Sequence, residues 1–161
     1  MATKAQATHL LNLAIRPALL GIKLWTPAAE ELLLGTAIVE SDLLLRKQLG
    51  GGPARGLFQM EPVTHDDIWA NYLKYKLDLA KSISAVMTSP AANKLLELEK
   101  NDKYASAMAR AHYSRAPTPI PQAGNVQAMA KYWKDYYNTW RGQGRETKYL
   151  EKWSKTMGSK K

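Results

Sequence analysis

The stretch "TPAAEELLLGTAIVES", residues 26–41, decides the fold. Thr26 is a residue type preferred at the N-cap of a helix, and Pro27 suits the first helical position. The acids that follow lie in the first turn, where the helix dipole favours them. The apolar run "LLLGTAIV" at 32–39 then predicts a buried helix that ends near residues 40–45. The run stops at Glu40, a carboxylate placed where a charge is least favourable.

The next segment, "ESDLLLRKQLGGGPARGLFQMEP" at 40–62, has a different character. Residues 46–63 form the longest stretch without helical periodicity. The three glycines and the proline at 50–53 predict a loop there, with at most a very short β segment near 46–63.

The rest of the chain is predicted to be helical almost throughout. A first helix is expected over 8–23, with a bend at Pro17. After the loop, Thr64 is the expected N-cap of the next helix, with Asp67 in the capping-box position. Further helices are predicted at about 78–87, 90–99 (opened by Ser89 and Pro90), 102–113, 126–140 and 145–156, the last two separated by "RGQG". The expected fold class is mainly α: one domain over 1–161, of about seven helices.

Composition limits the classes of protein that this chain can belong to. Its 161 residues, 45% hydrophobic, suit one globular domain with a sizeable core. The chain has no cysteine, its three histidines lack metal-ligand spacing, and no glycine-rich phosphate loop of the P-loop or dinucleotide type occurs. Neither a metal nor another cofactor is therefore expected. No apolar run is long enough for a transmembrane helix, and Asn12, Arg16 and Pro17 interrupt the N-terminal apolar segment where a signal peptide would be continuous.

The net charge of +9 is unevenly distributed. Residues 125–161 carry nine Lys or Arg against three Asp or Glu, a local net charge of +6. Such a surface favours polyanions, among them nucleic acid, anionic lipid and the bacterial envelope. The same third carries Trp133, Tyr136, Tyr137 and Trp140 at helical spacing. This stripe is typical of a packed core, with a base- or sugar-binding face as the alternative.

Glu40 is the first candidate for chemistry. On a helix its same-face neighbours are Leu33 and Thr36, and it lies at the C-terminal end. Burial and the helix dipole would both raise the pKa of its carboxyl, as a general acid near neutral pH requires. Taken alone, a helix-end glutamate more often points into water.

The residues after the loop favour a catalytic role for Glu40 over a solvent-exposed helix end. "ES" at 40–41, followed by "GLFQMEPVT" at 56–64, resembles the motif pair of the lysozyme-like lytic transglycosylases and their goose-type lysozyme relatives. The family pattern is Glu-Ser, then Gly-Leu-x-Gln-x-x-Pro-x-Thr. The matching positions are Gly56, Leu57, Gln59, Pro62 and Thr64. A third family element, a Tyr in "AYNAGP", is matched by Tyr113 in "AHYSRAP", although Ser114 and Ala116 replace the family's Asn and Gly.

The resemblance spans about 40–117 and implies a lysozyme-like catalytic domain. Its core would be 26–117, with the basic, aromatic helices of 125–157 packed on it. It implies Glu40 as the catalytic general acid and base. Glu61 is either a second carboxylate, as goose-type lysozymes tend to carry after the Gln, or an acid bonded to local backbone. Expected substrate-binding residues are Ser41, Phe58, Gln59 and Tyr113, the last also a candidate hydrogen-bond partner of Glu40.

The resemblance also implies a substrate and a setting. The enzyme would cleave the β-1,4 bond between N-acetylmuramic acid and N-acetylglucosamine in peptidoglycan, as a muramidase (a hydrolase) or a lytic transglycosylase. The segments "GGGPARGLFQMEP" and "YWKDYYNTWRGQG" further resemble bacteriophage-encoded members of this family. The protein would then be made in the host cytoplasm and act on the cell wall as a bacteriolytic endolysin or a virion component. The alternatives are a basic helical nucleic-acid-binding module and an inactive virion protein of the same fold. The sequence does not fix the oligomeric state.

Overall fold

The chain folds into a mainly helical structure without a β-sheet in the part described, residues 1–138 and 145–158 of a computed structural model. The helices are α1 (Lys4–Leu10), α2 (Arg16–Gly21), α3 (Pro27–Ser41), α4 (Pro62–Asn71), α5 (Leu77–Ala85), α6 (Lys94–Lys100), α7 (Asp102–Ser114), α8 (Val126–Tyr136) and α9 (Glu146–Met157). Short 3-10 turns lie at Leu49–Gly51 and Leu73–Tyr75. The predicted fold class is thus confirmed.

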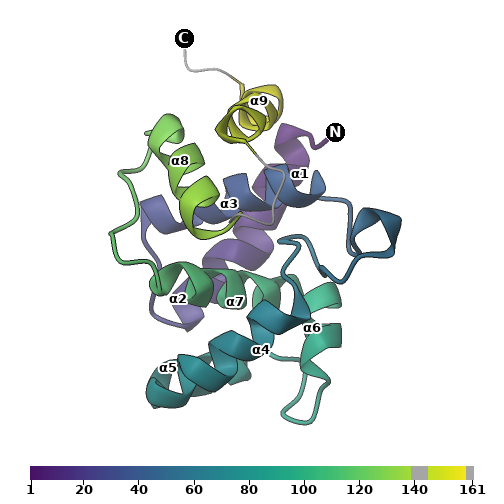
Figure 1. Cartoon of the computed structure of the whole chain (residues 1–161), viewed down its shortest axis with the longest axis vertical. Coiled ribbons are helices and arrows are strands. Elements are labelled where there is room, and N and C mark those ends of the chain that lie inside the picture. The colour runs from purple at the N-terminus through teal and green to yellow at the C-terminus, as the bar shows by residue number, and fades with distance from the viewer. Residues whose placement is uncertain (139–144, 159–161) are drawn as a thin grey trace.

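Helix α3 is the central element. Thr26 caps it by accepting a hydrogen bond from the Ala29 amide at 2.9 Å, and Pro27 starts it, as predicted. Every residue from Leu32 to Val39 is buried, because α3 packs against α1, α7, α8 and α9. Figure 1 shows α8 and α9 on one side of α3, with α7 and then α4, α5 and α6 on the other. A helix apolar all round is stable only in such a position.

The segment between α3 and α4 pairs only briefly with itself. Arg55 makes isolated antiparallel bridges with Lys47 and with Met60. These bridges are the very short β segment expected near 46–63.

Three predicted helix starts were wrong. The first helix begins at Lys4, since Thr3 and Gln6 form a capping box, and it continues through a π-helical turn at Leu11–Ile15. Pro17 lies just after this turn, at the start of α2, where its missing N–H is tolerated. Helix α6 starts at Lys94 because the Asn93 side chain accepts from the Leu95 and Leu96 amides.

Helix α4 is the third case. It begins at Pro62 with Glu61 as N-cap, so Thr64 lies inside the helix and caps nothing. Proline is pre-organised for the first helical position, and its preference overrides the capping preference of Thr64. Asp67 makes no capping box, because its carboxylate binds Arg115 and Asn71 instead.

The two C-terminal helices lie close to their predicted ranges. Helices α8 and α9 pack against each other and against α3. The "RGQG" stretch and Trp140 lie outside the described residues. No described helix is long and apolar enough to cross a membrane.

Candidate active site

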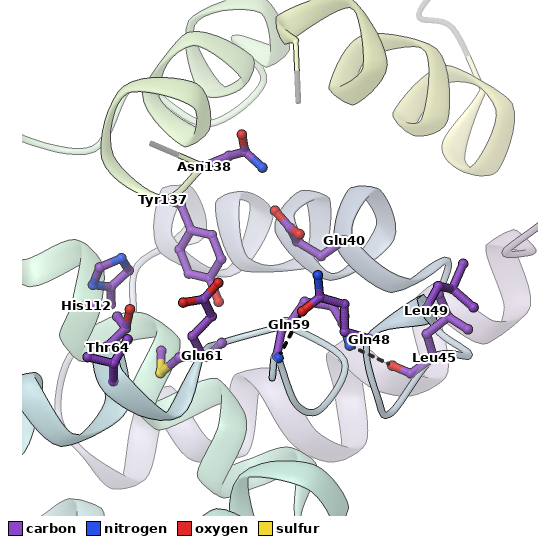
Figure 2. A pocket seen from close by; sticks show the side chains of 13 residues that line it. Glu40, Leu45, Gln48, Leu49, Gln59, Glu61, Thr64, His112, Tyr137 and Asn138 are labelled. Atoms are coloured by element: carbon purple, nitrogen blue, oxygen red, sulfur yellow. Dashed lines mark hydrogen bonds between the residues drawn. The ribbon is translucent and has the colours of Figure 1, made fainter. Parts of the chain in front are cut away.

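A cavity of about 500 Å³ opens where the end of α3 faces the 45–61 segment. This volume is in the range of small-ligand sites. Side chains from α3, the loop, the start of α4, α7 and the residues after α8 surround it, and Figure 2 shows Glu40 and Glu61 on its walls. Its lining residues are Glu40, Leu45, Gln48, Leu49, Ala54, Gln59, Met60, Glu61, Val63, Thr64, His112, Tyr137 and Asn138.

Glu40 contributes its carboxyl to this cavity from the last turn of α3. The Trp133 indole N–H on α8 donates to Glu40 Oε1 at 2.9 Å. Burial raises the pKa of Glu40, whereas the hydrogen bonds from Trp133 and Asn138 and the charges of Lys148 and Lys152 lower it. Burial prevails, so the direction agrees with the sequence-based prediction. A half-buried carboxyl of raised pKa has the properties of a general acid.

The end of α3 is fixed just beyond Glu40. Asp42 adopts the left-handed conformation with φ of 50° and pairs with Lys152 of α9 at 2.8 Å. Ser41 is buried, and its hydroxyl donates to the Ala37 carbonyl at 2.9 Å and accepts from the Leu43 amide at 3.2 Å. The Ser41 hydroxyl is therefore engaged by the backbone at the end of α3, and Ser41 is not among the residues that line the cavity.

Tyr113 is fully buried and does not line the cavity. The Thr36 hydroxyl donates to the Leu32 carbonyl at 2.8 Å, so the Tyr113 hydroxyl, 2.7 Å away, is the donor to Thr36. Tyr113 thus ties α7 to α3 one turn before Glu40. Its expected hydrogen bond with Glu40 is replaced by this one.

Phe58 is also buried, with its ring in the hydrophobic core. Its backbone carbonyl accepts a hydrogen bond from the Tyr137 hydroxyl at 2.6 Å. This bond joins the residues after α8 to the loop, and Tyr137, instead of Phe58, lines the cavity.

The "GLFQMEP" loop owes its shape to Gly56 and Gln59. Gly56 has a φ of +74°, and a Cβ at this position would lie 2.1 Å from the Leu98 carbonyl oxygen of α6. Gln59 also has a positive φ, 47°, which a non-glycine residue rarely adopts. Its side-chain amide donates to the Gly56 carbonyl at 3.0 Å, so Gln59 braces the turn while it lines the cavity. Backbone strain of this kind clusters at functional sites.

Glu61 lines the same cavity as Glu40 (Figure 2). It stands at the N-cap of α4, yet its carboxylate makes no capping hydrogen bond. The local backbone bond that was the alternative for Glu61 is therefore absent from the described structure.

Sequence reasoning did not assign Trp133, Tyr137, Gln48, Thr64, His112 or Asn138 to the site. Trp133 is buried in the core, as the aromatic stripe predicted, but its N–H also reaches Glu40. Helical spacing identified its buried face and could not identify this partner. Among the described residues, no three His, Asp or Glu side chains gather closely enough to hold a metal ion.

Comparisons with protein-family models, curated proteins and solved structures find no match to this chain.

Proposed function

We propose that the protein is a glycosidase that cleaves the β-1,4 bond between N-acetylmuramic acid and N-acetylglucosamine in peptidoglycan. One observation carries the proposal: the Glu40 carboxyl, with its pKa raised by burial, faces a cavity of about 500 Å³. The motif residues support it, since Gln59, whose amide braces the turn at Gly56, lines the same cavity as Glu40.

Glu40 would act first as a general acid. It gives its proton to the glycosidic oxygen as the bond from that oxygen to C1 of the muramic acid breaks. The Trp133 N–H then stabilises the carboxylate that forms. The raised pKa keeps a larger fraction of Glu40 protonated at the start of the reaction, and the hydrogen bond limits that rise.

The second step decides between two enzyme classes. In a lytic transglycosylase, Glu40 takes the proton of the C6 hydroxyl of the muramic acid while that oxygen attacks C1, which gives a 1,6-anhydro product. In an inverting hydrolase, a second carboxylate activates water on the opposite face of the sugar. Glu61 is the candidate for this role, because it lines the same cavity and has no capping role.

Positive charge supports an anionic polymer as substrate. Lys148 and Lys152 of α9 are close enough to Glu40 to lower its pKa, so the basic C-terminal third adjoins the cavity. The setting that we propose is a bacteriophage endolysin or virion-associated lysin, as the sequence resemblance implies.

The rival proposal of a nucleic-acid-binding module has less support. It requires an aromatic face open to bases, but Trp133 is 1% exposed and the Tyr137 hydroxyl is bonded to the loop. Nucleic-acid binding would also not explain why the Glu40 carboxyl lies in the cavity.

The test is incubation of the purified protein with peptidoglycan, followed by mass spectrometry of the released muropeptides. Wild type is expected to release them, and Glu40→Gln is expected to release at least a hundredfold less. Anhydro products would identify a transglycosylase, and reducing ends a hydrolase. If wild type releases nothing across a range of pH and salt, the proposal is wrong.

A further inference from the structure

His112 is a cavity residue that the proposed mechanism does not use. It lies on α7 beside Tyr113, within the "AHYSRAP" segment where the chain departs from the family pattern. Figure 2 shows its ring at the edge of the cavity, near Thr64 and Tyr137. The ring meets the Tyr137 ring edge-on, with centroids 5.1 Å apart and an interplanar angle of 74°.

Arg115 fixes the tautomer of this histidine. Its guanidinium Nη2 lies 3.0 Å from His112 Nδ1. A guanidinium has only donors, so Nδ1 must be the acceptor and carry no proton. The proton of the neutral ring is therefore on Nε2. Arg115 is itself held by Asp67, whose carboxylate accepts from Nη1 at 2.7 Å.

The Nε2–H group has no hydrogen-bond partner among the described residues, and it is not fully buried. Within the described residues, only Tyr149 Oη and Thr156 Oγ1 are fully buried side-chain polar atoms without a partner. Since His112 Nε2 is not among them, it retains contact with solvent, and the ring belongs to the cavity wall.

The His112 ring is also neutral near pH 7. Burial and the charge of Arg115 lower its pKa to about 4, against a smaller opposing effect of Asp67. It is therefore a fixed donor and a poor proton shuttle near neutral pH.

We propose that His112 is a substrate-binding residue whose Nε2–H donates a hydrogen bond to an uncharged oxygen of the glycan in the cavity. This inference rests on the proposed function. The chemistry of such an acceptor is shared by the carbonyl of an N-acetyl group and by a sugar hydroxyl. Asp67 and Arg115 are positioning residues, since they select the tautomer that aims the proton at the ligand. The "SRA" departure after Tyr113 thus supplies the arginine that orients this donor.

The test uses the full chain and soluble, uncross-linked peptidoglycan strands. His112→Phe keeps a ring against Tyr137 but removes the donor, so its KM is expected to rise roughly three- to tenfold, the effect of one neutral hydrogen bond. His112→Gln carries an amide N–H near the position of Nε2 and is expected to restore most of the binding. The kcat should change less than KM, and the pH profile of kcat should keep its shape.

A second arm identifies the acceptor. If it is the acetamido carbonyl, wild type binds N-acetylated strands more tightly than de-N-acetylated strands, and His112→Phe loses this preference. If it is a hydroxyl, His112→Phe weakens binding of both strands equally. Either result supports the proposal.

A third arm tests the positioning role. Arg115→Met is expected to raise the pKa of His112 in an NMR titration and to raise KM by a smaller factor than His112→Phe. A KM within twofold of wild type for His112→Phe would overturn the proposal. So would an equal loss in His112→Gln and His112→Phe, because the ring's packing would then be what matters. Absence of muropeptide release by wild type would instead refute the proposed function itself.

Discussion

Substituting Gly56 by alanine tests whether a close backbone contact shapes the catalytic loop. An alanine at position 56 would have to keep a φ of +74°, and its methyl group would lie 2.1 Å from the Leu98 carbonyl oxygen. The left-handed conformation costs alanine about 1–2 kcal/mol. Forcing the loop away from α6 adds about 1–3 kcal/mol, as overpacking typically does. The free energy of unfolding should therefore fall by roughly 2–5 kcal/mol.

Gly51→Ala is the matched control. Gly51 has a φ of +79°, but nothing lies within 4 Å of a Cβ at this position. Only the conformational cost remains, about 1–2 kcal/mol. The difference between the two variants then measures the steric contact with α6 alone.

The assay is urea denaturation of both variants, supported by thermal unfolding. For a domain of this size, Gly56→Ala should lower Tm by roughly 6–15 °C and Gly51→Ala by about 3–6 °C. Muropeptide release, measured below both transitions, should fall only in Gly56→Ala, because this loop carries Gln59 and Glu61. Equal unfolding free energies for the two variants would refute the steric argument.

Three further predictions concern the carboxyl groups. Because burial raises the folded-state pKa of Glu40 above its value in the unfolded chain, stability falls as pH rises from the unfolded-state pKa to the folded-state pKa. Glu40→Gln should therefore be more stable than wild type at pH 7 in urea denaturation, with the difference narrowing toward pH 4; a less stable variant at pH 7 would contradict this. Trp133→Phe removes a hydrogen bond that lowers the pKa of Glu40, so the alkaline limb of the pH–rate profile should move to higher pH. Trp153 of α9 is not among the groups that shift this pKa, so Trp153→Phe should leave the limb in place. If the alkaline limb of the pH–rate profile stays in place in Trp133→Phe, the hydrogen bond from Trp133 does not lower the pKa of Glu40. Glu61→Gln should reduce any reducing-end products about a hundredfold and spare anhydro products; persistent reducing ends would exclude Glu61 as the base.

The sequence was enough to predict the central helix and the place of Glu40. The cap at Thr26, the proline after it and the mostly apolar run at 32–39 all favour the same helix, and a residue that ends such a run must lie at the edge of the core. The predicted start of α4 was wrong because two local residue preferences competed there. Thr64 and Pro62 each favoured a helix start, and proline prevailed.

The partners of the site residues could not be predicted from local patterns. Trp133 is 93 positions from Glu40 in sequence, and Arg115 meets Asp67 across 48 positions. The family motif implied a substrate-binding role for Ser41, yet Ser41 does not line the cavity, although it follows Glu40 directly. One step along a helix turns the side chain by about 100°, and the Ser41 hydroxyl bonds to the Ala37 carbonyl within the helix.

The central claim is that Glu40 is the acid that breaks the glycosidic bond. Its most direct test is mass spectrometry of the muropeptides that wild type and Glu40→Gln release from the same peptidoglycan, with both proteins shown to be folded. Wild type is expected to release muropeptides and Glu40→Gln at least a hundredfold less, although the variant should be the more stable protein at pH 7. Equal release by the two proteins would contradict it.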